Sequence, residues 1–236
     1  MLWQDTLLSF TYDRPPSSVA LGSSITFTSD TEGLSFEETV VNVCRIVLDR
    51  RWQETYGAPR DPVQNILDFK QQLEKVQSMA APFLNDKNLC VSLQQHLERL
   101  ALGIHFGYVA CRFIRSYMEA TGQLFSDTSA AAAECLQRAK EVLENFLTLH
   151  RLSANACRSW AFVQNVVSCA ITLKTSEKTL PEESRNHEVL LQRLVAVLKK
   201  EEKESEWIDT DTNIRHFGPY SRALKALRRV YDEEEI

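Results

Sequence analysis

The segment 89–120 constrains the fold most strongly, because it is apolar over more of its circumference than any other helical pattern in the chain. Leu97, Ile104 and Tyr108 follow one another at helical spacing, and Val109 widens the apolar face. A helix that is apolar over so much of its surface has to be covered by other elements. We therefore expect a long, central, buried helix with the rest of the chain packed around it.

The remaining segments repeat the same helical periodicity, and alternating strand patterns are nearly absent. Seven glycines and seven prolines are few for 236 residues, which favours an all-α fold. The apolar stripes predict about eight amphipathic helices, which begin near Trp3, Ser35, Asp61, Leu89, Thr128, Trp160, Ser184 and Tyr220. The sequence thus predicts an all-α fold in which residues 1–236 form a single helical domain, with a loop at 17–34.

Local signals mark several helix ends and one close helix contact. Ser35 and Glu38 have the spacing of a capping box, and Asp61-Pro62 is typical of an N-cap followed by proline in the first turn.

Gly103-x-x-x-Gly107 places two small residues one turn apart, so we expect a neighbouring helix to approach closely there. The uncharged run around these glycines is only about 11 residues long, whereas a membrane span needs about 20. No membrane partner is expected.

The net charge of −5 argues against direct binding of nucleic acid, because such binding draws on cations placed against phosphates. Basic pairs occur at Arg50-Arg51, Lys199-Lys200 and Arg228-Arg229, but each lies near acidic residues. We interpret all three pairs as solvated helix faces.

The six cysteines do not form a metal-binding pattern, because no C-x-x-C pair occurs among them. They are Cys44, Cys90, Cys111, Cys135, Cys157 and Cys169, and most occupy apolar helix positions, where a thiol acts as a small hydrophobe. None of the five histidines has a metal-ligand neighbour, and His105 fits a hydrogen-bonded core position. We expect no metal, no cofactor and no catalytic residue in this chain.

The segment 2–16, which reads LWQDTLLSFTYDRPP, carries a more specific pattern. Its residues Trp3, Asp5, Ser9, Arg14 and Pro15 resemble the Trp/Tyr-x-Asp-x-x-x-Ser-x-x-x-(Gly)-Arg-Pro signature of the fungal-specific transcription factor domain, the region that follows the binuclear zinc cluster in fungal regulators. Asp13 departs from the glycine that the family commonly has. We expect the motif to be structural, with Arg14 donating to a carboxylate or to free helix carbonyls.

A second stretch of the chain also resembles this family. Segment 97–117 is followed by Cys135-x-x-x-Ala139, similar to the family's long apolar helix, polar loop and Cys-x-x-x-Ala succession, although Ser116-Tyr117-Met118 stands where the family usually has an Arg-Pro pair. The resemblance implies the C-terminal two-thirds of the family domain, with zinc expected only in an N-terminal cluster that this chain lacks.

The resemblance implies a regulatory or effector domain of a fungal transcription factor, acting in the nucleus as a pathway-specific regulator of RNA polymerase II transcription. A metabolic or secondary-metabolite gene cluster is one kind of target. The expected partners are other proteins, a second copy of the chain, or a small effector. A free-standing all-α interaction or scaffold protein without a transcriptional role is the main alternative, and an all-α enzyme is a third hypothesis.

Overall fold

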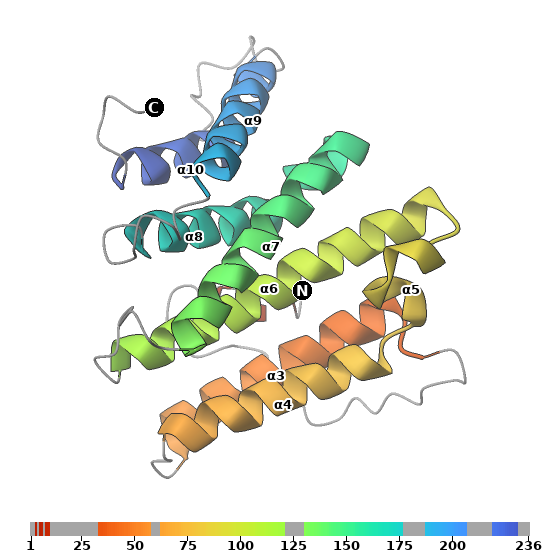
Figure 1. Ribbon diagram of the computed structural model, residues 1–236, viewed down its shortest axis with the longest axis vertical. Coiled ribbons are helices and arrows are strands. Elements are labelled where there is room, and N and C mark those ends of the chain that lie inside the picture. The colour runs from red at the N-terminus through yellow and green to blue at the C-terminus, as the bar shows by residue number, and fades with distance from the viewer. Residues whose placement is uncertain are drawn as a thin grey trace. The chain divides into compact units, whose positions relative to one another are not determined.

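The computed structural model describes residues 3, 5, 6, 8 and 9 and the ranges 33–57, 62–120, 130–176, 187–206 and 219–230. Within these residues the chain forms eight α-helices, α3 to α10, and two short 3-10 helices, η1 and η2 (Figure 1). The five described residues before position 10 are also helical. An isolated β-bridge is present among the described residues, but no strand is. The predicted all-α fold is therefore confirmed.

The described residues fall into two compact units, one ending at Leu102 and the other beginning at Gly103. The boundary lies within α6 (Leu93–Ala120), so this helix contributes one end to each unit. Each unit is described by itself below. A single domain spanning residues 1–236 stays a prediction.

The first unit is based on an antiparallel helix pair, α3 (Phe36–Tyr56) and α4 (Pro62–Met79) (Figure 1). The predicted capping box begins α3: the Glu38 backbone N–H donates to Ser35 Oγ at 3.3 Å, and the Ser35 N–H donates to Glu38 Oε2 at 2.8 Å. Pro62 is the first residue of α4, as expected, while Asp61 lies outside the described residues. Two short elements then lead into α6: α5 (Pro82–Asn85) and η1 (Lys87–Leu89).

A short β-bridge joins the entry to α3 and the exit from α4. The Leu34 N–H donates to Met79 O and the Ala81 N–H donates to Leu34 O, both at 2.8 Å. Gly33 precedes this bridge with φ at +87°, and a Cβ there would lie 3.1 Å from the Ala81 backbone, so glycine suits this position on two counts. Of the expected loop 17–34, only Gly33 and Leu34 are described, and Leu34 is buried.

The interpretation of Arg50-Arg51 as a solvated face is wrong for Arg50. Its side chain is 8% exposed, and Nη2 donates to the Asn65 carbonyl of α4 at 3.0 Å. Its Nε also lies 3.8 Å from the Glu54 carboxylate. Charge patterning along α3 could not reveal this position, because the carbonyl that fixes the guanidinium belongs to another helix.

The second unit packs four further helices with the C-terminal part of α6. They are α7 (Ala130–Leu152), α8 (Trp160–Ser176), α9 (Glu188–Glu206) and α10 (Pro219–Arg228), with η2 (Asn155–Arg158) between α7 and α8. Helix α7 contacts α8, α9 and η2, and α10 contacts α8 and α9 (Figure 1). The six residues predicted as the stripe of α7 are all buried: Cys135, Ala139, Val142, Leu143, Phe146 and Leu149.

The glycine pair of α6 faces α7, as its spacing predicts. A Cβ built at Gly107 would lie 2.6 Å from Val142 Cγ2 and 3.3 Å from the Arg138 carbonyl oxygen. A Cβ at Gly103 would lie 2.6 Å from the side-chain amide of Asn145. The two helices therefore approach too closely for a larger residue at Gly107 unless α7 shifts.

Two buried stripes begin later in the chain than their periodicity suggests. The predicted helix from Leu89 is interrupted at 90–92, because Ser92 Oγ accepts the Gln95 N–H at 3.2 Å and α6 begins only at Leu93. Leu89 and Leu93 are about half exposed, whereas Ile104 and Tyr108 are buried. Val189, expected on the stripe of α9, is likewise exposed, and the buried residue is Leu191. The expected caps at 126–128 and the stripe residue Tyr231 lie outside the described residues.

The close contact between α6 and α7 yields a paired prediction. Gly107→Ala should lower the free energy of unfolding by about 1 to 2 kcal/mol, because overpacking against Val142 and the Arg138 carbonyl outweighs the gain in helix propensity. Gly103→Ala should be close to neutral, since the Asn145 side chain is half-buried and can turn away. Urea unfolding of the two variants measures the difference, and equal midpoints would contradict the assigned contact.

Candidate functional site

Three of the five residues of the family-like motif lie in the described part of the structure. Ser9 is fully buried, and Trp3 and Asp5 are half-buried on the same helical segment. Arg14 and Pro15 lie outside the described residues. Ser9 therefore lies in the core, and the structural role expected of the whole motif stays a prediction.

The first unit has an open groove, which is a candidate site for a ligand. It has a volume of about 570 Å³ and lies where the start of α3, the Ala81–Phe83 turn, η1 and the first turns of α6 meet. Phe36, Phe83 and Leu89 contribute apolar wall, and Glu37, Glu38 and Glu98 contribute carboxylates. This volume is within the range that small-molecule and peptide side-chain pockets occupy. Sequence patterns do not indicate this groove, because its walls come from four separate elements.

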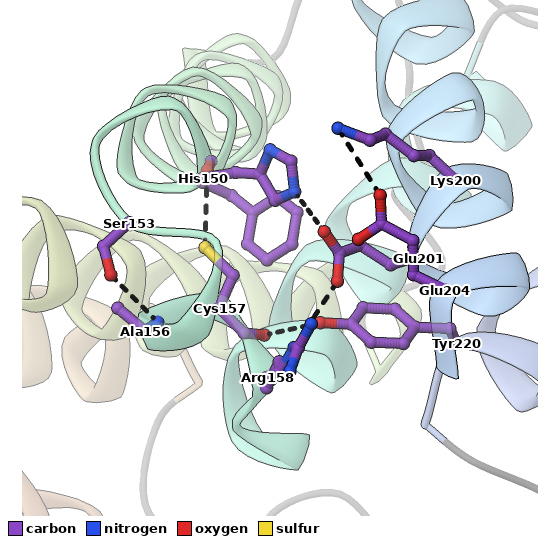
Figure 2. A network of polar contacts seen from close by, with 10 residues as sticks. His150, Ser153, Ala156, Cys157, Arg158, Lys200, Glu201, Glu204 and Tyr220 are labelled. Carbon is purple, nitrogen blue, oxygen red and sulfur yellow. Dashed lines mark hydrogen bonds and ion pairs between the residues drawn. The ribbon is translucent and has the colours of Figure 1, made fainter. Parts of the chain in front are cut away.

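A network of charged side chains links three elements of the second unit (Figure 2). The Glu201 carboxylate of α9 accepts a hydrogen bond from His150 Nε2 of α7 at 2.8 Å, and its other oxygen lies 3.6 Å from Arg158 Nε of η2. Glu201 is 1% exposed, whereas Arg158 is partly open to solvent. A carboxylate this deeply buried needs charged or hydrogen-bonding partners, and His150 and Arg158 supply them.

Tyr220 and Cys157 complete the surroundings of Glu201. The Tyr220 hydroxyl donates to the Cys157 carbonyl at 3.4 Å, which ties α10 to η2 (Figure 2). Burial, followed by the nearby Glu201 carboxylate, raises the pKa of Tyr220 well above its ordinary value and the pKa of Cys157 to about 12. Both groups therefore stay neutral at physiological pH, and Cys157 has no thiolate to act as a nucleophile beside His150. This arrangement favours a link between helices over a reacting centre.

The sequence analysis did not identify Glu201, because residues 201–206 read as one charged run, EEKESE. The available signal was its position: Leu191, Leu194 and Leu198 are buried, and Glu201 continues their spacing one turn further. A carboxylate on the buried stripe of an amphipathic helix indicates a buried partner. Which residue is the partner depends on which helix packs against α9. The spacing of residues along α9 does not show this.

Three buried thiols from different helices also lie together. Cys111 Sγ of α6 is 3.4 Å from Cys135 Sγ of α7, and Cys169 of α8 hydrogen-bonds with Cys111. The hydrogen bond with Cys111 and burial raise the pKa of Cys135, and burial foremost raises that of Cys169. Cys135 and Cys169 are therefore protonated, weak nucleophiles that fill space between the helices, whereas the hydrogen bond from Cys135 lowers the pKa of Cys111.

His105 is a satisfied core residue, as the sequence indicates. Its ring stacks on Phe162 at 4.9 Å between centroids, and the Asn165 side-chain amide donates to Nδ1 at 3.3 Å. Burial lowers the pKa of His105 to about 3, so the ring is neutral and carries its proton on Nε2. A neutral histidine between an aromatic ring and an amide is typical of a core position.

No group of three or more metal-ligating side chains occurs among the residues that the structure describes. Over the same ranges, none of the helices combines the length and the apolar character that crossing a bilayer requires. No family model matches the chain, and no curated protein or solved structure matches it significantly.

The buried carboxylate of the network supplies a stability prediction. Glu201→Gln should lower the free energy of unfolding by about 1 to 3 kcal/mol, since it weakens a buried, charge-assisted hydrogen bond with His150 and leaves Arg158 without its countercharge. The matched control is Glu204→Gln, one turn along α9, which removes only an exposed pair with Lys200 at 3.7 Å.

The control variant should change stability by less than about 0.5 kcal/mol, because exposed pairs contribute little. Chemical unfolding at neutral pH compares the two variants. Equal effects would show that the interactions of the buried Glu201 contribute no more to stability than an exposed ion pair does.

Proposed function

We propose that this chain is the regulatory, or effector, domain of a fungal transcription factor and works in the nucleus on transcription by RNA polymerase II. It has no DNA-binding module among its own motifs, so it would act through contacts with other proteins, with a second copy of itself, or with a small effector. The proposal rests on the resemblance carried by Trp3, Asp5, Ser9, Arg14 and Pro15.

The burial of Ser9 is the observation that supports this proposal best. A serine whose side chain is fully buried within a helical segment is uncommon unless the position has a packing or hydrogen-bonding role. Trp3 and Asp5 are half-buried on the same segment. The three described residues of the pattern thus lie at buried or half-buried positions, which supports a structural role for the motif.

Charge and the described polar groups favour protein contacts as the mode of action. The net charge of −5 opposes a phosphate-binding surface. The charged network around Glu201 and the thiols around Cys111 are buried and link helices. What the described part of the chain offers to a partner is the groove between α3, α5 and α6 and the apolar side chains near it.

The proposal is tested by tethering the whole chain to a heterologous DNA-binding module in a fungal cell that carries a matching reporter gene. We expect the tethered chain to change reporter transcription several-fold, up or down, relative to the module alone. Ser9→Lys, which places a charge at a buried motif position, should abolish the change, whereas Glu74→Lys on the exposed face of α4 should not.

Reporter transcription that stays at the level of the module alone, with the fusion present in the nucleus at normal amounts, would contradict a transcriptional role. That result would favour the free-standing all-α interaction protein.

A further inference from the structure

The groove of the first unit combines apolar walls with an acidic lining. Phe36 and Phe83 are half-buried and Leu89 is about half exposed, so their side chains are accessible from the groove. Three carboxylates line it, from Glu37, Glu38 and Glu98, and no lysine or arginine is among the described residues that do so. An occupant must therefore supply apolar contact and positive charge together.

The three carboxylates are not equally committed to the fold. Glu38 closes the capping box by accepting the Ser35 N–H, and Glu98 accepts a hydrogen bond from the Gln94 side-chain amide at 2.6 Å. Glu37 is exposed in the first turn of α3. A carboxylate has several acceptor positions, so each of the three can still receive a hydrogen bond from a bound cation.

Exposed apolar side chains continue beside the groove. Leu89, Val91 and Leu93 are 50%, 89% and 58% exposed, three large aliphatic side chains within five residues. The Val91 N–H donates to the side chain of Gln95, which itself lines the groove, at 2.7 Å. This hydrogen bond holds the exposed segment next to the groove. Contiguous exposed aliphatic side chains of this kind mark interaction surfaces.

From this juxtaposition we propose that the groove is the docking site for a short peptide segment of a protein partner, in which a lysine or arginine is flanked by bulky aliphatic side chains. The basic side chain lies among Glu37, Glu38 and Glu98. The aliphatic side chains contact Phe36, Phe83 and Leu89 and extend along Val91 and Leu93. A volume of about 570 Å³ accommodates a few side chains, which fits a short segment better than a whole helix. The inference holds whether or not the chain regulates transcription.

The test is a titration of the whole chain with three short synthetic peptides, each acetylated and amidated. The first alternates leucine and lysine, the second replaces leucine by serine at the same charge, and the third replaces lysine by glutamate. Two-dimensional amide NMR measures both the affinity and the location of binding. We expect saturable binding of the first peptide alone, with shift changes concentrated at 33–38, 81–83 and 89–98, and an affinity that falls as salt is raised.

Two double charge variants distinguish the effect of the groove carboxylates on peptide affinity from the effect of the overall negative charge. The double variant Glu37→Gln with Glu98→Gln should weaken the first peptide about tenfold. The matched control, Glu74→Gln with Glu144→Gln, removes the same charge at exposed positions of α4 and α7 and should leave the affinity unchanged. Leu89→Ser, at an already exposed position, should also weaken binding without unfolding the chain.

Several results would overturn the inference. If both charge variants weaken peptide affinity equally, or if the leucine and serine peptides bind equally well, binding depends only on general charge attraction. If the chemical-shift changes lie outside the groove, or if the first peptide shows no saturable binding, the groove is not the docking site. Binding of butylammonium as tight as that of the peptide would assign the groove to a small amine instead.

Discussion

The close approach of α6 and α7 at Gly107 constrains how the helices of the second unit can pack. Because Val142 Cγ2 and the Arg138 carbonyl occupy the space that a Cβ would need, the two backbones can lie near each other only where α6 has no side chain. The same approach brings Cys111 against Cys135. Helix α7 contacts α6 at Gly107 and also contacts α8, α9 and η2, and its apolar stripe from Ala132 to Leu149 is buried.

Polar groups inside the units serve mainly to fix which elements lie together. Glu201 ties α9 to α7 and η2 through His150 and Arg158, and Arg50 ties α3 to the Asn65 carbonyl of α4. Each would be costly to bury alone, so each specifies its neighbour as well as stabilising it. The β-bridge of Leu34 does the same for the backbone of the first unit, and the groove lies beside it because the bridge holds the start of α3 next to the Ala81–Phe83 turn.

Features with local causes could be predicted from the sequence. The capping box of Ser35, the buried stripe of α7, the core position of His105 and the close contact at Gly103 and Gly107 each depend on spacing within one segment. The missed features depend on residues far apart in the chain. Glu201 and Arg50 are buried because another helix provides a partner, and the groove needs four elements at once. Periodicity shows which face of a helix is apolar, but it does not show how much of that face a neighbouring element covers. The exposure of Leu93 and Val189 at the starts of their helices therefore could not be predicted.

We expect the contact of α6 with α7 to be the most stable part of the second unit. Native-state hydrogen exchange measures this directly, because amides that open only with the cooperative unit exchange most slowly. Within the second unit, we expect the slowest amide exchange at residues 104–114 and 135–149. We also expect Gly107→Ala to increase the exchange rate in both segments together. Exchange at 135–149 as fast as that at the exposed first turn of α9 around Val189, or a response to Gly107→Ala confined to α6, would contradict these expectations.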